Sequence, residues 1–176
     1  MTLLDRRQID TQVGGIAVLE TKRLVLRAPR FEDAKRVAAL VNDRRIAENT
    51  ARIPHPYGTD DAKQWISAAI PHSGAYVITI GGEIIGACGI EEAELGYWIG
   101  VPFWGCGYAT EAARRLIEYA FDDLGYKVLT ASARVSNPAS RRVLEKCGFE
   151  WTGVGLCRIR AISSSVPVDR FRLERA

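Results

Sequence analysis

Hydrophobic and polar residues alternate with two different periods along this chain, and the change of period separates predicted strands from predicted helices. Runs that alternate as strands do cover residues 23–28, 75–80, 83–90, 94–101, 128–135, 150–162 and 166–174. The helical spacing of three or four residues marks 31–41, 59–71, 108–124 and a short stretch at 138–146. This order predicts an α+β fold, in which a mixed, mostly antiparallel sheet of about seven strands is flanked by about four helices.

Turn residues support this reading of the elements. Gly81 and Gly82 separate the second and third strand-like runs and are the strongest hairpin signal in the chain, so these runs and the next one should be antiparallel neighbours. The third helical stretch is the most strongly amphipathic, and Gly125 follows it as the predicted C-terminal cap. Pro54 and Pro56 stiffen the connection between the first two helices, which predicts an ordered loop of the kind that often touches substrate.

The composition is that of an ordinary globular domain, with 176 residues, of which 47% are hydrophobic and 26% charged. We therefore expect a single domain over residues 19–176, preceded by a flexible lead-in at 1–18 that carries no periodicity. The net charge of +3 is too small to indicate nucleic acid as a partner. The last third of the chain is richer in arginine than in acid, which suits an anionic cofactor.

The cysteines and the N-terminus indicate the compartment. The four cysteines are Cys88, Cys106, Cys147 and Cys157. They form no C-x-x-C pair and have no histidine at ligand spacing, so we expect reduced thiols rather than bridges or a metal site. The N-terminus has no apolar segment of signal-peptide length, and the longest uncharged runs are broken by proline or glycine. These features predict a cytoplasmic protein without a membrane span.

The most informative chemistry lies where the fourth strand-like run leads into the third helix. Gly105 and Gly107 let the backbone approach a ligand closely, and the helix they open offers unpaired N–H groups with a partial positive charge. A dinucleotide-binding fingerprint would need glycine in place of Thr110 and an acid closing the next strand, which ends in Arg134 and Val135. A P-loop would need Gly-Lys-Ser/Thr, which the sequence lacks. The remaining interpretation is a loop that binds the phosphates of another nucleotide-like cofactor.

The segment Trp104 to Ala112, WGCGYATEA, resembles the acetyl-CoA loop of the GNAT superfamily of N-acetyltransferases. Residues 137–140 (NPAS) and 142–149 (RVLEKCGF) resemble the last helix of that family, while TKRL at 21–24 and PHPY at 54–57 resemble its RimJ/RimL-like branch. The resemblance covers about residues 19–175 and implies a GNAT-like fold with acetyl-CoA as cosubstrate. Trp104 stands where the broader superfamily has Gln or Arg, but backbone amides hold the phosphates, so the cradle should be retained.

By this resemblance, the backbone of Ile99, Gly100 and Val101 pairs with the pantetheine arm of the cofactor as a short extra strand would. The implied phosphate-binding residues are Gly105, Cys106, Gly107, Tyr108, Ala109 and Thr110. Asn137 is implied to contact pantetheine, and Arg142 to pair with a phosphate of CoA. Plainer alternatives stay open, because Thr110 can satisfy its own helix, Asn137 can cap the last helix and Arg142 can lie on an exposed helix face.

Candidate catalytic residues also come from the resemblance. Glu94 opens the strand that leads to the loop, where some superfamily members carry a general-base glutamate; the alternative is a solvated strand end. The last helix lacks the tyrosine that many members use to protonate the leaving thiolate, so Ser140 is the implied acid, or else it makes a local backbone bond. Tyr57 is a candidate substrate-binding residue or a packing residue. His55 and His72 have no triad-like partner and are expected to be solvated loop residues.

The implied activity is N-acetyl transfer to a primary amine, either a protein N-terminal α-amine or a small-molecule amine. A non-catalytic CoA-binding or sensing module would keep the same fold and stays open, since neither the base nor the acid is fixed by the residues alone. An antibiotic-modifying enzyme would need an acidic pocket for polycationic drugs, and the slight basic excess argues against it. We expect no nucleic acid and no membrane as partner, while the exposed edge of the final hairpin favours a homodimer.

Overall fold

The computed structural model describes residues 16–72 and 74–176, so most of the predicted lead-in at 1–18 lies outside the described residues. The strands are β1 (Leu19–Glu20), β2 (Val25–Arg27), β3 (Ala75–Ile80), β4 (Glu83–Glu91), β5 (Glu94–Ile99), β6 (Val128–Arg134), β7 (Glu150–Ile159) and β8 (Ser164–Glu174). The helices are α1 (Ala34–Val41), α2 (Arg44–Ala47), α3 (Thr59–His72), α4 (Tyr108–Asp122) and α5 (Pro138–Lys146). Short 3₁₀ turns lie at η1 (Phe31–Asp33), η2 (Val101–Phe103) and η3 (Arg160–Ile162).

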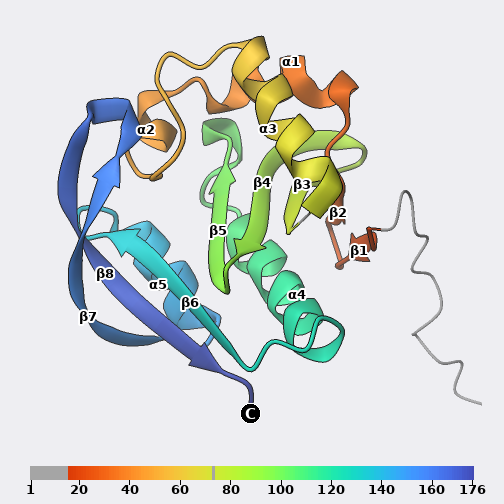
Figure 1. The fold of residues 1–176 in the computed structure, drawn as a ribbon. Coiled ribbons are helices and arrows are strands. Elements are labelled where there is room, and N and C mark those ends of the chain that lie inside the picture. The colour runs from red at the N-terminus through yellow and green to blue at the C-terminus, as the bar shows by residue number, and fades with distance from the viewer. Residues whose placement is uncertain (1–15, 73) are drawn as a thin grey trace, which may run out of the picture.

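The strands of the described residues form one eight-stranded sheet in the order β1-β2-β3-β4-β5-β6-β8-β7 (Figure 1). Neighbouring strands are antiparallel except β5 and β6, which are parallel. The predicted α+β class with a mixed, mostly antiparallel sheet is therefore confirmed. The sequence pattern missed the two-residue strand β1 and the four-residue helix α2, because neither is long enough for a period to register.

The parallel contact between β5 and β6 is short, and it opens a gap in the sheet. Only Glu94↔Thr130 and Leu95↔Ala131 are paired, and beyond them the two strands diverge, as Figure 1 shows. On its other side β5 stays paired with β4 as far as Ile99. Backbone groups of β5 that face β6 beyond Leu95 therefore have no strand partner, and the glycine loop follows at the end of this unpaired edge.

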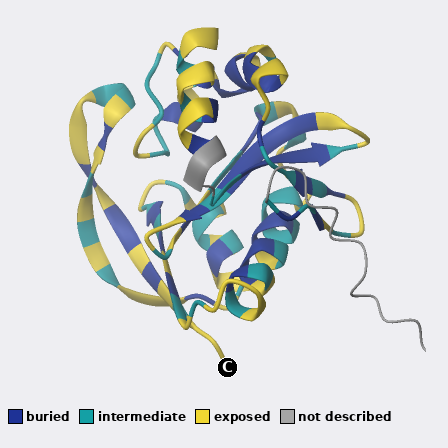
Figure 2. Cartoon of the chain, turned by 45° about the vertical axis from the view of Figure 1, so that its right-hand side comes forward, coloured by how far each residue is buried: buried dark blue, intermediate teal, exposed yellow. Residues whose placement is uncertain are grey.

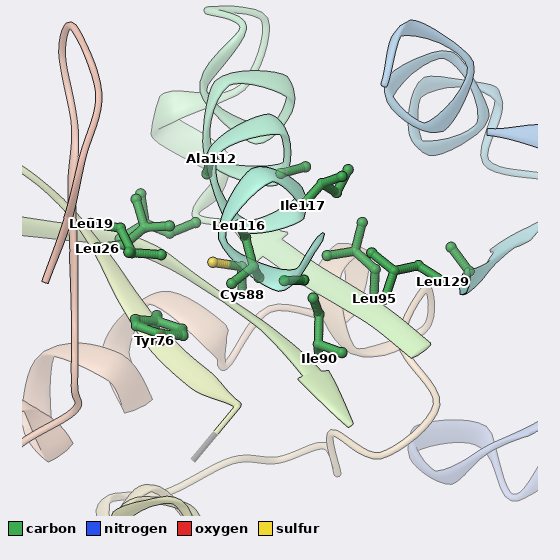
Figure 3. Packing of buried hydrophobic residues seen from close by; sticks show 14 of the residues in the cluster. Leu19, Leu26, Tyr76, Cys88, Ile90, Leu95, Ala112, Leu116, Ile117 and Leu129 are labelled. Carbon is green, nitrogen blue, oxygen red and sulfur yellow. The ribbon is translucent and has the colours of Figure 1, made fainter. Parts of the chain in front are cut away.

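Two apolar cores cover the two faces of the sheet. The first core packs α4 and α5 on one face, with Leu116 and Leu144 each 1% exposed (Figures 2 and 3). The second core packs α1, α2 and α3 on the other face, and Ile66 is fully buried there. Leu95 of β5 belongs to the first core, whereas Trp98 packs against the second. Successive side chains of β5 point to opposite faces of the sheet, and this alternation decides which of them lie on each face beside the gap.

Glycine positions bear out the local predictions, with small shifts at helix ends. Gly81 and Gly82 have φ of +56° and +83°, as a two-residue hairpin turn with two left-handed residues requires. Gly125 is also left-handed, with φ of +77°, but α4 already ends at Asp122. Leu124, predicted as an apolar helix position, therefore lies outside the helix and is 49% exposed. Pro71 lies in the last turn of α3 rather than beyond its end.

The two ends of the sheet differ in how they meet solvent. Ala17, inside the predicted lead-in, is 8% exposed and belongs to the first core, so ordered packing begins before residue 19. At the opposite edge, β7 leaves Trp151, Val154 and Leu156 exposed. These apolar side chains lie on the hairpin for which a dimer was predicted, and the dimer stays a prediction.

Three observations concern the compartment and the metal. All four cysteines are free thiols, as predicted. Within residues 16–72 and 74–176, no helix is long and apolar enough to cross a membrane. In the same part of the chain, no group of three or more His, Cys, Asp or Glu side chains is placed to hold a metal ion. The cytoplasmic location stays a prediction.

Candidate active site

The glycine loop forms a cradle of free backbone amides beyond the end of β5. Gly105 and Gly107 have φ of +75° and +79°, left-handed values that favour glycine. The first backbone bond of α4 joins Glu111 N to Gly107 O at 3.1 Å. Within the described residues, none of the six N–H groups from Gly105 to Thr110 has a hydrogen-bond partner. Six unpartnered donors at the positive end of the α4 dipole suit a ligand with phosphate groups.

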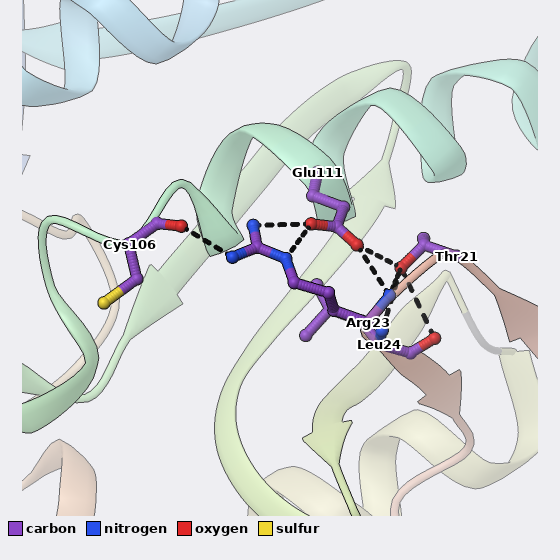
Figure 4. Close-up of polar contacts among 5 residues, drawn as sticks. All are labelled: Thr21, Arg23, Leu24, Cys106 and Glu111. Atoms are coloured by element: carbon purple, nitrogen blue, oxygen red, sulfur yellow. Dashed lines mark hydrogen bonds and ion pairs between the residues drawn. The ribbon is translucent and has the colours of Figure 1, made fainter.

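A clamp formed by Thr21, Arg23 and Glu111 holds this loop (Figure 4). Arg23 Nη1 donates to the carbonyl oxygen of Cys106 at 3.0 Å, and Arg23 Nε donates to Glu111 Oε2 at 2.7 Å. Thr21 Oγ1 donates to Glu111 Oε1 at 2.7 Å, and the Arg23 guanidinium lies 4.5 Å from the centre of the Tyr108 ring. Burial raises the pKa of Glu111, but the hydrogen bonds from Thr21 and Arg23 outweigh it and lower the pKa, so the carboxylate stays charged. The sequence reasoning used Thr21 and Arg23 for the resemblance, and Arg23 as the start of a strand, and missed this contact.

Beside the loop lies a hollow of about 610 Å³ that charged side chains line. Gly107 and Thr110 form the part next to the cradle. Its cations are Lys22, Arg23, Arg114, Arg115 and Lys146, and its carboxylates are Glu20, Glu111 and Glu118. The excess of positive charge favours an anionic ligand that extends beyond the cradle.

The backbone contacts predicted along β5 need one correction. Gly100 N donates to Ile85 O at 2.8 Å, and Gly100 O accepts a bond from the following turn at 2.9 Å, so neither group of Gly100 is free. Ile99, one residue earlier, points its backbone groups away from β4 and into the gap. Its carbonyl oxygen accepts a bond from Trp104 Nε1 at 2.7 Å. Within the part of the chain that the structure describes, the N–H groups of Ile99 and Val101 have no partner and remain for an extended ligand, whereas the N–H of Gly100 is used.

Ser140 of α5 is in contact with Tyr97 of β5, which the sequence reasoning missed. Tyr97 Oη lies 2.9 Å from Ser140 Oγ, and either hydroxyl can be the donor. Tyr97 Oη also lies 3.2 Å from the carbonyl oxygen of Ser140. Burial raises the pKa of Tyr97 to about 12, so the phenol stays neutral at physiological pH. The signal in the sequence was the alternation of β5, since Tyr97 shares a face with Leu95 and a hydroxyl on an apolar face needs a partner.

The first turn of α5 holds the other predicted contacts. Asn137 Oδ1 accepts a bond from Ser140 N at 3.3 Å, which confirms its role as the helix cap. Arg141 is engaged by Asp169 at 3.4 Å and by a carboxylate on its own helix. Arg142 is exposed and has no partner among the described residues, so its charge is available to an anion. Contact of Asn137 or Arg142 with the cofactor stays a prediction.

Glu94 lies on the opposite face of β5 from Tyr97. It is exposed, and its pairing with Thr130 places it where β5 and β6 begin to diverge. Gly96 is on the same face, and a Cβ added there would meet nothing within 4 Å. Trp98 continues this face toward the second core. A candidate base and a hydroxyl pair therefore lie on the two sides of one gap.

The proline loop packs Tyr57 into the second core and encloses one nitrogen of His55. Tyr57 is 9% exposed in the second core, where its backbone N–H donates to Asn42 Oδ1 at 2.9 Å. Burial raises its pKa to about 12. Tyr57 therefore packs in the second core, one of the two roles expected for it, and its contact with the acceptor stays a prediction. His55 is half-buried, and its Nδ1 is enclosed without a partner among the described residues, so this nitrogen is not solvated as predicted, while the side chain of His72 lies outside the described residues.

Comparisons with known proteins agree with this geometry. Residues 23–150 match the family described as acetyltransferase (GNAT) domain. FsC-acetyl coenzyme A-N(2)-transacetylase of Aspergillus fumigatus is 30% identical over 114 residues, which are 53% of this chain and 48% of that protein. The putative ribosomal N-acetyltransferase YdaF of Bacillus subtilis is 46% identical over 59 residues, 34% of this chain and 32% of the relative. The chain therefore matches less than half the length of either relative. RimJ of Mycobacterium smegmatis, solved in complex with CoA-disulfide, shares the fold with a TM-score of 0.74 and 19% identity, covering 86% of this chain and 81% of RimJ.

Proposed function

Because the chain belongs to the GNAT acetyltransferase family, we propose that it is an N-acetyltransferase that moves acetyl from acetyl-CoA directly to a primary amine. The observation that carries the proposal is the run of six unpartnered N–H groups from Gly105 to Thr110, placed at the end of an unpaired strand edge. Phosphates suit such a cradle and an extended arm suits such an edge, and CoA contains both. The same cofactor appears in the names of two similar proteins, the FsC transacetylase and RimJ with CoA-disulfide.

We assign the cofactor contacts to four groups of residues in this site. The amides from Gly105 to Thr110 bind the pyrophosphate, and the N–H groups of Ile99 and Val101 pair with the pantetheine arm. Asn137 caps α5 through its oxygen and keeps its amide nitrogen for the arm. Arg142 and the cations of the 610 Å³ hollow meet the remaining phosphate charge.

Acetyl-CoA supplies the acetyl group already activated as a thioester. Glu94, exposed where the gap begins, accepts the proton that the amine must lose before its nitrogen attacks the thioester carbon. On the other face, Ser140 donates a proton to the sulfur as the carbon–sulfur bond breaks. Tyr97 fixes the Ser140 hydroxyl at 2.9 Å and so acts through it as a positioning residue. The ammonium form of the acceptor loses two protons, one to Glu94 before the attack and a second after the carbon–nitrogen bond forms. The second proton replaces the one that Ser140 gives to the sulfur, so the products are the amide, the CoA thiol and one released proton, without an acyl-enzyme.

The type of acceptor amine can be inferred from the free energy needed to deprotonate it. An α-amine with a pKa near 8 costs about 1 kcal/mol to deprotonate at pH 7, whereas a lysine near 10.4 costs about 4–5 kcal/mol. A single exposed carboxylate such as Glu94 is best matched to the smaller cost. We therefore propose a primary amine of the α-amine type, on a peptide or on a small molecule.

Release of CoA thiol from acetyl-CoA, measured across a panel of small amines and N-terminal peptides, tests the proposed activity. We expect turnover with at least one acceptor. Glu94→Gln should lower kcat by about 100-fold with little change in the KM for acetyl-CoA, because general-base catalysis is worth at least that factor. Glu92→Gln, in the exposed turn before β5, is the matched control and should behave as wild type. An unchanged kcat in Glu94→Gln removes Glu94 as the base.

A CoA-binding or sensing module without turnover is the alternative outcome of the same experiment. Such a module would release no thiol with any acceptor, yet acetyl-CoA would still raise its free energy of unfolding. The expected rise is about 2.7 kcal/mol at a ligand concentration of about 100 times Kd. Stabilisation without turnover across the whole panel would therefore contradict the proposed transfer and keep the cofactor assignment.

A further inference from the structure

A second hollow, of about 390 Å³, is lined by the loop that follows α2 and by the tip of the β7–β8 hairpin. Figure 1 shows these two segments near each other at one edge of the molecule. Its lining residues are Ala51, Arg52, Arg158, Arg160 and Ser163, so three of its five residues are arginines. Arg160 N donates to Ala51 O at 3.0 Å, and this bond joins the loop to the hairpin. The hollow is thus built by two segments that are distant in the sequence and fastened to each other.

The charges of this hollow are only partly compensated. Arg52 forms an ion pair with Glu91, whereas the guanidinium groups of Arg158 and Arg160 have no hydrogen bond or ion pair within the described residues. Among the residues that the structure describes, no carboxylate lines the hollow, and Ser163 adds a hydroxyl. Two free guanidinium groups, each a planar fork of donors, are suited to a carboxylate or a phosphate.

The position of the hollow relates it to the acceptor side of the gap. Arg52 reaches Glu91, the last residue of β4, and Glu91 lies directly opposite Glu94 across the β4–β5 turn. Arg134, the last residue of β6, donates through Nη1 to the carbonyl oxygen of Glu48 at 2.9 Å, which holds the start of the same loop against the sheet. Arg52 is therefore linked to the candidate base through one ion pair and one cross-strand pair, and Arg158 and Arg160 line the same hollow as Arg52.

From this arrangement we propose that the acceptor amine carries an anionic group, a carboxylate or a phosphate, and that Arg52, Arg158 and Arg160 bind it. The proposal rests on the acetyl transfer proposed above and specifies its substrate class. The anionic end enters the hollow while the amine lies at Glu94, so a small, anionic amine is preferred over a neutral or polycationic one. The same arginines repel polycationic acceptors, because both carry positive charge.

Matched acceptors test this preference in the acetyl-transfer assay. The dipeptide amides Gly-Asp and Gly-Asn test the carboxylate, and the amides of Gly-phosphoserine and Gly-Ser test the phosphate, so every acceptor is an α-amine. For at least one pair, the double variant Arg158→Gln/Arg160→Gln should lower the ratio of kcat/KM for the anionic over the neutral amine by about tenfold or more relative to wild type. Because this ratio is compared between the variant and wild type, differences in pKa between the amines cancel. The KM for acetyl-CoA should not change. An unchanged ratio for both pairs overturns the proposal.

Inorganic phosphate gives a second readout that needs no turnover. In calorimetric titrations at constant ionic strength, with CoA present to occupy the glycine loop, wild type should bind phosphate more tightly than the double arginine variant by about tenfold. The matched control is Lys35→Gln/Lys63→Gln, which removes the same charge from two exposed positions on α1 and α3 and should bind as wild type does. If no amine turns over but this difference persists, the acetyl transfer fails and the anion site stands. Equal binding by wild type and the arginine variant overturns the anion site itself.

Discussion

Replacing Tyr97 by phenylalanine removes one oxygen and keeps the ring, so the variant isolates the hydroxyl pair between β5 and α5. The lost contacts are the 2.9 Å bond with Ser140 Oγ and the 3.2 Å contact with the Ser140 carbonyl oxygen. A net value of about 1 kcal/mol for a neutral hydrogen bond predicts a loss of that size in the free energy of unfolding. Because the bond also fixes the Ser140 hydroxyl, kcat should fall about tenfold, which corresponds to about 1.4 kcal/mol in the barrier.

Urea denaturation and the thiol-release assay measure these two effects separately. Ser140→Ala should lower kcat at least as much as Tyr97→Phe, and the double variant should lose no more than Ser140→Ala alone, since Tyr97 acts through Ser140. Tyr126→Phe is the control, because Tyr126 is also half-buried but its hydroxyl has no hydrogen bond in the described part of the chain. If Tyr97→Phe loses stability while its kcat stays within about twofold of wild type, the hydroxyl pair is structural and the positioning role is refuted.

Three further changes have defined outcomes. Asp33 forms a two-point ion pair with Arg27 at 2.8 and 2.9 Å, so Asp33→Asn should lower the free energy of unfolding at pH 7 by about 3 kcal/mol in urea titrations. Burial raises the pKa of Asp33, but the bonds from Arg27 outweigh this effect, so the pKa in the folded protein lies below that in the unfolded chain. The difference in the free energy of unfolding between wild type and Asp33→Asn should therefore be full above about pH 4 and vanish as the pH falls through the pKa of the folded protein. Gly96→Leu should fold and bind acetyl-CoA with unchanged affinity in calorimetry. The added side chain enters open space beside Glu94, so the KM for the amine should rise about tenfold. An unchanged KM for the amine would place the acceptor elsewhere. Trp104→Phe loses the 2.7 Å bond to a β5 carbonyl and should unfold about 1 kcal/mol more easily, which an unchanged urea midpoint would contradict.

Features that depend on neighbouring residues were predictable from the sequence. The hairpin at Gly81 and Gly82 and the left-handed glycines of the loop rest on local backbone preference, so the residues alone indicate them. The amphipathic α4 was predicted for a similar reason, since its apolar face repeats over several turns. These local features are also the ones that carry the resemblance to the acetyl-CoA loop.

Contacts between distant segments were not predictable. Tyr97 and Ser140 are 43 positions apart, and Arg23 and Glu111 are 88 positions apart, so no periodicity relates their side chains. Gly100 shows a second reason for error. The sequence placed it in the strand before the loop, whereas β5 ends at Ile99, and only the backbone bond to Ile85 O shows that its N–H is already used.

Burial was the third property that the sequence left open. Tyr57 in a proline loop reads equally well as the wall of a site or as a core residue, and only the packing of α1 and α3 around it decides for the core. His55 between two prolines looked solvated, yet its Nδ1 is enclosed. Both residues lie in a loop whose path over the sheet depends on tertiary contacts rather than on its own composition.

Calorimetric titration of CoA into wild type and Gly107→Trp protein tests the phosphate cradle most directly. Gly107 has φ of +79° and borders the free amides, so a tryptophan there both strains the backbone and covers the donors. Gly125→Trp is the matched control, because Gly125 has φ of +77° with nothing within 4 Å of an added Cβ. Wild type and the control should bind CoA alike, and Gly107→Trp should bind at least about 100-fold more weakly. Equal affinity in all three folded proteins would contradict the assignment of the loop to CoA.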